Sequence, residues 1–261
     1  MTLPLAAIWR ISRRDLSARI RGLRLLAICL FLGVATLAAI GSLTAGIGEE
    51  LSRRGQTILG GDIEVAIAQR TATRAELAAL RKAGSLSETI RLRAMAISND
   101  SLLAELKAID GAYPHYGALK LQDGAVAEAP AKGEIYIGPT LSERLDIANG
   151  GTVRFGEVTF KVAGIISDEP DRLGEGFTLG PVAIINMASL PDTGLIQPGS
   201  MYEAKYRVKL RPDQDAAAVG KALEAKFPSA GWEITDRSNG APGTRRFIER
   251  MGQFLTLVGL A

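Results

Sequence analysis

The chain is most apolar at its two ends. Residues 25–48 contain no charged side chain, and as a helix they would extend about 36 Å, a little more than the ~30 Å hydrocarbon core of a bilayer. A cleaved signal peptide has a shorter apolar region, of about 7 to 15 residues. The pattern therefore predicts a transmembrane helix over residues 25–48.

The segment before this helix is basic. Six arginines and a single acidic residue, Asp15, lie between residues 10 and 24. An excess of arginine beside a membrane helix marks the cytoplasmic side, so residues 1–24 are expected in the cytoplasm. Apolar residues recur every three to five positions among the arginines, which favours an amphipathic helix along the inner leaflet. A purely topogenic signal fits the same pattern.

The end of the chain is apolar again. The stretch "GQFLTLVGLA", residues 252–261, has no charge, but as a helix it would rise only about 15 Å, half of a bilayer core. We expect residues 245–261 to be the start of a second transmembrane helix, truncated in this chain. Residues 49–244 would then lie on the far side of the membrane.

The region between these ends begins and finishes with similar patterns. After a helical stalk over residues 49–60, alternation predicts a strand in "DIEVAIA", and Thr73 and Glu76 have the spacing of a capping box at the start of a helix that ends by Gly84. The strand "ETIRLRAMAI" follows. Near the other end, "EAKYRVKLR" and "GWEIT" read as strands, and they flank a helix expected to start at Pro212 and Asp213.

The middle of the chain has a different pattern. Short strands punctuated by glycine, with a hairpin through Gly156 and Glu157 and one helix in "PTLSERLDI", predict a β-rich insertion. The fold class is therefore α+β. We expect one membrane-proximal subdomain from residues 61–98 and 203–236, and an inserted subdomain from residues 101–190.

Catalytic motifs are missing from the sequence. His115 is the only histidine and sits in the turn-like "GAYPHYGAL", where a loop role is favoured over catalysis. The chain has neither a G-x-S-x-G motif nor a P-loop. The carboxylates of "ISDEPDRLGEG" lack the spacing of a calcium loop and read as a solvated connector; they are Asp168, Glu169, Asp171 and Glu175.

Composition narrows the function further. The net charge of +3 owes much to the arginines near the first membrane helix, so it does not call for a nucleic-acid partner. The single cysteine, Cys29, lies within the predicted membrane helix, so the exported region has no disulfide. We expect no enzyme activity and no catalytic, cofactor-binding or metal-binding residues.

Several stretches resemble the ABC transporter permeases of the FtsX/MacB type, and among them the YbbP-like permeases. They are "ILGGDIEV", "AYPHYG", "EIYIGPTLSERLDIANGGTVRFGEVTFKVAGIISDEPDR", "FTLGPVAIIN" and "TGLIQPGS". Each is short, but their order between two membrane segments covers nearly the whole chain. The resemblance implies that residues 61–244 form a MacB-like periplasmic core domain in a multi-pass protein of the inner membrane.

The resemblance also implies a function. Such permeases work with a separate cytoplasmic ABC ATPase, whose motion is transmitted through the membrane to the periplasmic domain. YbbP-like members are thought to extract or export hydrophobic compounds or lipids, alongside a periplasmic esterase or thioesterase. The alternative is a single-anchor periplasmic sensor or scaffold, which would need no ATPase.

The topology can be tested by cysteine labelling. A cysteine placed at Ser87 should react with a membrane-impermeant reagent in cells with a permeabilised outer membrane, whereas one at Ser12 should not, because the arginines hold residues 1–24 in the cytoplasm. Labelling at Ser12 but not at Ser87 would reverse the topology.

Overall fold

The computed structural model describes residues 55–172 and 180–237, and some residues between 24 and 46, all of them helical. The chain divides into two compact units, one of residues Leu51–Ala241 and one of Met1–Glu50 with Pro242–Ala261. No helix within the described residues is both long and apolar enough to span a bilayer. The predictions for residues 1–23, 49–54 and 245–261 lie outside the described residues, and the membrane helix over 25–48 stays a prediction.

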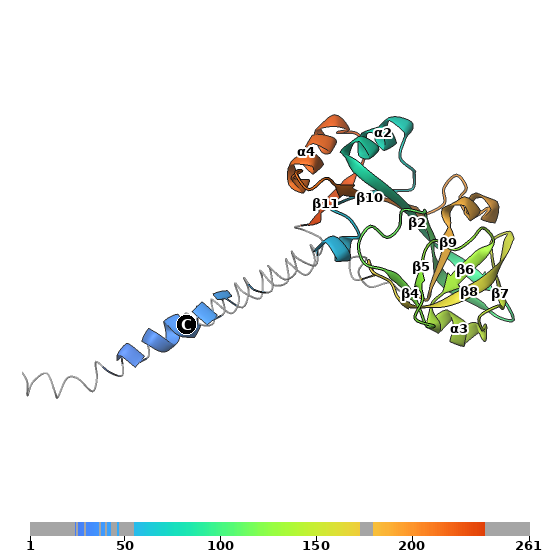
Figure 1. Cartoon of the computed structure of the whole chain (residues 1–261), viewed down its shortest axis with the longest axis horizontal. Coiled ribbons are helices and arrows are strands. Elements are labelled where there is room, and N and C mark those ends of the chain that lie inside the picture. The colour runs from blue at the N-terminus through green and yellow to red at the C-terminus, as the bar shows by residue number, and fades with distance from the viewer. Residues whose placement is uncertain are drawn as a thin grey trace, which may run out of the picture. The chain divides into compact units, whose positions relative to one another are not determined.

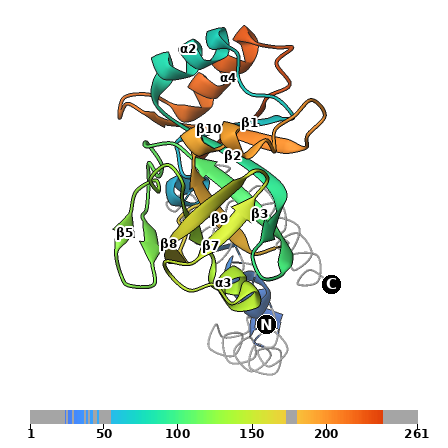
Figure 2. The same cartoon turned by 90° about the vertical axis from the view of Figure 1, so that its right-hand side faces the viewer.

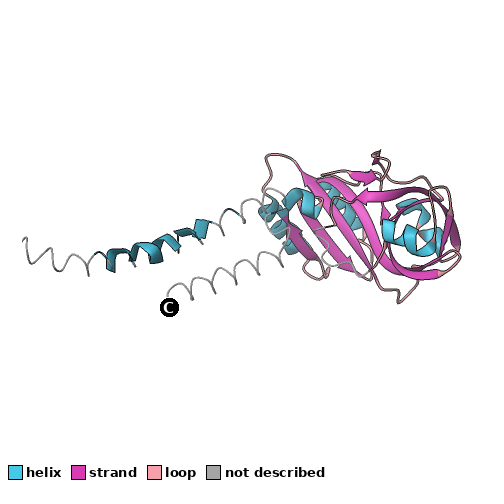
Figure 3. Cartoon of the chain, turned by 90° about the horizontal axis from the view of Figure 1, so that it is seen from below, coloured by secondary structure: helices cyan, strands magenta, loops and turns pink. Residues whose placement is uncertain are grey.

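Strands are the main regular secondary structure of the unit of residues 51–241 (Figure 3). Four of them form an antiparallel sheet in the order β11-β1-β10-β2, and α2 and α4 lie side by side on one face of it (Figures 1 and 2). This is a split β-α-β arrangement built from both ends of the unit. The elements are β1 (Ile63–Ala68), α2 (Arg74–Ala83), β2 (Gly84–Ile97), β10 (Tyr202–Leu210), α4 (Ala216–Lys226) and β11 (Glu233–Asp236).

The sequence predicted the start of α2 correctly but not the start of α4. The capping box of α2 is confirmed: Thr73 Oγ1 accepts a hydrogen bond from Glu76 N at 3.3 Å, and Glu76 Oε2 accepts one from Thr73 N at 2.6 Å. The predicted start of the other helix at Pro212 and Asp213 is wrong. The N-cap of α4 is Asp215, whose carboxylate satisfies free N–H groups of the first helical turn.

The middle of the chain forms a closed barrel. Strand β7 pairs with both β2 and β8, which completes a ring in the order β2-β3-β9-β6-β8-β7 (Figure 2). The further elements are β3 (Ser101–Ile109), β4 (Leu119–Leu121), β5 (Val126–Ala127), β6 (Glu134–Ile137), α3 (Pro139–Leu145), β7 (Thr152–Phe155), β8 (Val158–Asp168), β9 (Val182–Asn186), η1 (Met187–Ser189) and η2 (Pro191–Thr193). The predicted α+β class with a β-rich insertion is confirmed.

Strand β2 belongs to both the sheet and the barrel. Its residues 84–92 pair with β10, whereas residues 89–97 pair with β3 and the last two also pair with β7. Alternate side chains from Ile90 to Ala96 point into the apolar core that α2 and α4 help to cover. The other face of β2 carries Ser87 and Thr89, which are also buried, so the labelling test of topology requires an exposed position such as Asp123 in place of Ser87. One strand thus serves both parts of the unit. The division into a membrane-proximal subdomain of residues 61–98 and 203–236 and an inserted subdomain of residues 101–190 stays a prediction.

The predicted hairpin through Gly156 and Glu157 is confirmed and joins β7 to β8. Gly156 has φ +56°, in the left-handed region, and a Cβ atom at this position would lie 2.0 Å from the carbonyl oxygen of Thr193. That oxygen accepts a hydrogen bond from Glu157 N at 3.0 Å, so it is held in place.

We predict that Gly156→Ala destabilises the fold far more than Gly124→Ala. Both positions have positive φ, but no atom lies within 4 Å of a Cβ built on Gly124. Left-handed strain alone should lower the free energy of unfolding by about 1 kcal/mol at Gly124. The clash at Gly156 should add about 2 kcal/mol or more. Equal losses in chemical denaturation would show that Thr193 moves away freely.

Candidate functional site

Asp62 joins the two ends of the compact unit. It is 2% exposed, and its carboxylate accepts hydrogen bonds from Gln56 Nε2 at 2.7 Å, Tyr116 OH at 2.9 Å, Leu210 N at 2.9 Å and Arg237 Nη1 at 3.1 Å. Its carbonyl oxygen accepts a further bond from Arg237 N. Burial raises the pKa of Asp62, but these donors together lower it below its usual value. We call Asp62 and Arg237 the entry junction.

Arg207 is the most highly connected side chain of the sheet. It lies on β10 opposite Glu64 of β1 and is 1% exposed. Its guanidinium donates to Leu59 O at 2.8 Å and to Thr89 Oγ1 at 3.0 Å, and it pairs with Glu64 at 3.0 Å and Asp171 at 2.9 Å. Arg207 therefore connects the helical turn of residues 55–59 to two strands and to the turn after β8.

Lys107 is the second buried cation. It lies on β3 and is fully buried, and its ammonium group donates to Glu169 at 2.6 Å, to Asp171 at 2.9 Å and to Tyr113 OH at 3.1 Å. The Tyr113 hydroxyl donates in turn to Asp171 at 2.5 Å. Asp171 thus bridges the cations of β3 and β10.

These contacts form one buried charge network of Lys107, Arg207, Glu64, Glu169 and Asp171. Burial raises the pKa of Asp171, but Lys107 and Arg207 outweigh it and hold that pKa well below the usual range. Burial lowers the pKa of Lys107, and the two carboxylates oppose this shift. The network is therefore held by mutual compensation of its charges.

The reading of the 168–175 carboxylates as a solvated connector is wrong for two of them. Glu169 is 7% exposed and Asp171 is fully buried, whereas the side chain of Asp168 is 62% exposed and lies 3.9 Å from Lys120. Glu175 lies outside the described residues. No local signal indicated the burial of Glu169 and Asp171, because their partner Lys107 alternates with apolar residues in the run "LLAELKAI", as a solvent-facing strand residue would.

His115 lies in the loop between β3 and β4, away from any assembled catalytic group among the described residues. It is half-buried, and its Nε2 has no hydrogen-bond partner there. Burial lowers the pKa of His115. In residues 55–172 and 180–237, no cluster of His, Cys, Asp and Glu could hold a metal ion. The expectation that no residue is catalytic or binds a metal or cofactor stays a prediction.

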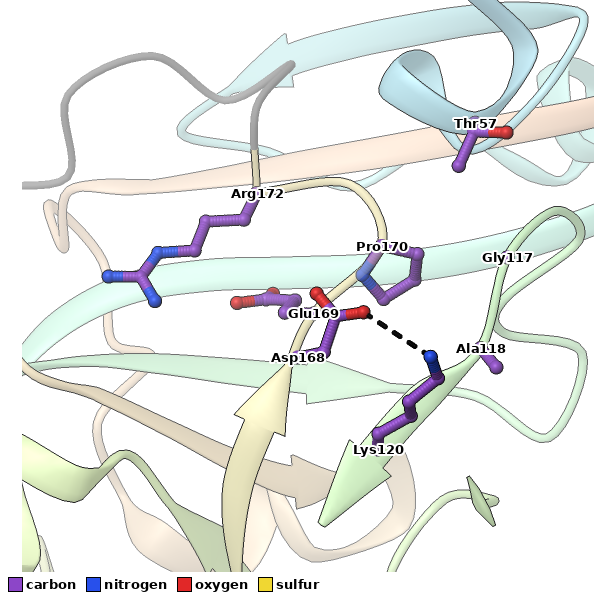
Figure 4. A pocket seen from close by; sticks show the side chains of 8 residues that line it. All are labelled: Thr57, Gly117, Ala118, Lys120, Asp168, Glu169, Pro170 and Arg172. Carbon is purple, nitrogen blue, oxygen red and sulfur yellow. Dashed lines mark ion pairs between the residues drawn. The ribbon is translucent and has the colours of Figure 1, made fainter. Parts of the chain in front are cut away.

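A surface pocket of about 620 Å³ adjoins the network (Figure 4). Its walls come from the helical turn of residues 55–59, the loop before β4 and the turn after β8. The lining residues are Thr57, Gly117, Ala118, Lys120, Asp168, Glu169, Pro170 and Arg172. Glu169 therefore belongs both to the pocket wall and to the buried charge network.

The fold and the entry junction define an α+β domain whose two chain ends meet at one edge of its sheet. The family model of the MacB-like periplasmic core domain matches residues 25–226, and the chain belongs to this family. The expected FtsX/MacB-type resemblance is confirmed. The chain thus carries a periplasmic domain of the kind found in ABC transporter permeases.

The chain is 29% identical over 235 residues to the ABC transporter permease YbbP of Escherichia coli (strain K12). That match covers 89% of this chain but 29% of the permease, so the chain spans less than a third of its relative's length. Among solved structures, the periplasmic region of MacB from Actinobacillus actinomycetemcomitans is 14% identical, with a TM-score of 0.49, covering 74% of this chain and 95% of that one. The extracellular domain of the noncanonic ABC-type transporter YknZ from Gram-positive bacteria is 12% identical, with a TM-score of 0.47. This match covers 67% of this chain and 100% of that domain.

We predict that Asp171→Asn lowers the free energy of unfolding by about 3–5 kcal/mol at pH 7, because it leaves two buried cations undercompensated. The folded pKa of Asp171 lies below its ordinary value of 3.8. The carboxylate therefore stabilises the fold above that pH, and the stabilisation is lost as the pH falls toward the folded pKa. The difference in the free energy of unfolding between wild type and variant should therefore become smaller below about pH 4.

The matched control is Asp168→Asn, three residues earlier. Its partner Lys120 is also exposed, so its loss should change stability by less than about 1 kcal/mol. Chemical denaturation across pH measures both variants. A pH-independent difference for Asp171→Asn would contradict the charged role of this residue.

Proposed function

We propose that the chain is part of the permease subunit of an ABC transporter in the inner membrane. Family membership and the similarity to a permease support this proposal. A separate cytoplasmic ABC ATPase would hydrolyse ATP, and this chain would transmit the resulting motion to its periplasmic domain without being an enzyme itself.

The entry junction is the observation that carries the mechanical part of the proposal. Within the described part of the compact unit, Asp62 binds Gln56 near its beginning and Arg237 at its end. Strands β1 and β11, which start and end the sheet along the chain, also pair directly. A displacement of either end would therefore act on the sheet at one place, through hydrogen bonds of 2.7–3.1 Å to the buried carboxylate of Asp62.

We further propose, from the family resemblance, that the domain handles hydrophobic compounds or lipids at the membrane. Membrane lipids would then be direct partners, and a periplasmic esterase or thioesterase would act on what the permease delivers. The full protein would cross the membrane several times.

We predict that Arg237→Ala reduces stimulation of the partner ATPase several-fold when the permease and the ATPase are reconstituted together. Loss of this side chain removes the ion pair to Asp62 at 3.1 Å and loosens the exit of the chain. The Arg237 side chain is 44% exposed, so the domain itself should stay folded.

The control variant is His115→Ala, which should leave stimulation nearly unchanged because His115 belongs neither to the entry junction nor to the buried charge network. Equal thermal unfolding of both variants would show that folding is not the cause. An ATPase insensitive to the presence of the chain would instead favour a single-anchor sensor or scaffold. Loss of activity in His115→Ala alone would point to an enzyme.

A further inference from the structure

We propose that the turn of residues 169–172 is a releasable latch that couples the helical turn of residues 55–59 to the barrel. The turn follows β8, a barrel strand, yet its two buried carboxylates bind cations from different parts of the unit. Asp171 pairs with Arg207 of the sheet and with Lys107 of β3, and Glu169 pairs with Lys107.

Arg207 also binds the helical turn of residues 55–59, which we call the entry segment. The same guanidinium that holds Asp171 also donates to the carbonyl oxygen of Leu59 at 2.8 Å. A shift of residues 55–59 would therefore displace Arg207 from Asp171 or carry the turn along. The latch is thus a contact of three parts: the entry segment, Arg207 of the sheet, and the turn that follows barrel strand β8. Arg207 lies between the other two and binds both.

Packing provides a second link between the same segments. A Cβ atom at Gly117 would lie 2.5 Å from Pro170 Cβ and 3.4 Å from Thr57 Cγ2. The loop before β4 therefore fits between the latch and the helical turn only because residue 117 has no side chain. Residues 55–59 cannot approach the latch without pressing on this loop.

The chemistry of the contact suits release. Separating buried ions from one another returns both to water, and hydration offsets much of the lost attraction, whereas separating apolar side chains has no such compensation. Of the partners of Asp171 described above, only Tyr113 belongs to an apolar cluster, and it contacts Asp171 through its hydroxyl group. The pocket of about 620 Å³ beside Glu169 and Pro170 leaves room for the turn to move. The latch can therefore open while both clusters stay packed.

Hydrogen–deuterium exchange on the full chain tests the coupling. In Asp171→Asn, exchange should become at least about tenfold faster both in residues 169–172 and in residues 55–60, since a lost charged hydrogen bond alone has an effect of this size. The control Asp168→Asn should change neither segment. Faster exchange confined to residues 169–172 would overturn the proposal.

A second variant covers the case in which Asp171→Asn fails to fold. Lys107→Met combined with Glu169→Met replaces the two buried ion pairs of Lys107, with Glu169 and with Asp171, by apolar contact and keeps the pair of Asp171 with Arg207. Exchange should become several-fold slower in both segments because the latch no longer gains hydration on opening. Unchanged or faster exchange in residues 55–60 would contradict a hydration-assisted latch.

The role of the latch in transport rests on the proposed permease function, but the exchange experiment does not. If both segments respond while the ATPase ignores the chain, the latch stands and the permease proposal fails. If the ATPase depends on Arg237 while the two segments exchange independently, the permease proposal stands and the latch fails.

Discussion

The ion pair between Arg207 and Asp171 is the interaction on which the rest of the structure depends. A guanidinium that is 1% exposed in the middle of a sheet must be compensated, because an isolated buried charge is strongly unfavourable. Glu64 supplies one carboxylate from the neighbouring strand, and the turn after β8 supplies another from the barrel. This requirement holds the turn against the sheet and, through Leu59, holds the entry segment in place.

The need to compensate the charge of Arg207 connects the sheet to the barrel, because Arg207 lies on a sheet strand and Asp171 follows a barrel strand. Strand β2 runs through both the sheet and the barrel, and its apolar face packs beneath the helices. Its other face lies on the side of the sheet that carries the charge network, where Thr89 accepts from Arg207. One side is thus apolar packing that resists change, and the other is an ionic contact that water can replace. The motion that we propose for this domain needs both properties.

Local signals in the sequence predicted much of the fold. Thr73 with Glu76, the alternation around Ile63 and Tyr206, and the Gly156 hairpin all act over a few residues, so their outcome can be read from nearby positions. The start of α4 was misplaced because Pro212 and Asp215 are both typical of helix starts. The burial of Glu169 and Asp171 could not be predicted, since Lys107 and Arg207 are distant in sequence and look like the solvent-facing positions of alternating strands.

A double-mutant cycle between Gln56 and Asp171 tests the central claim most directly. Gln56 binds Asp62 at the entry junction, whereas Asp171 binds Arg207, so these two side chains have no partner in common. Coupling between them would have to pass through residues 55–62, together with Arg207 or the loop that contains Gly117. Gln56→Ala and Asp171→Asn would be measured singly and together by chemical denaturation of the full chain. A connected entry segment predicts non-additivity of more than about 1 kcal/mol, whereas free energies that add within about 0.5 kcal/mol would contradict the account.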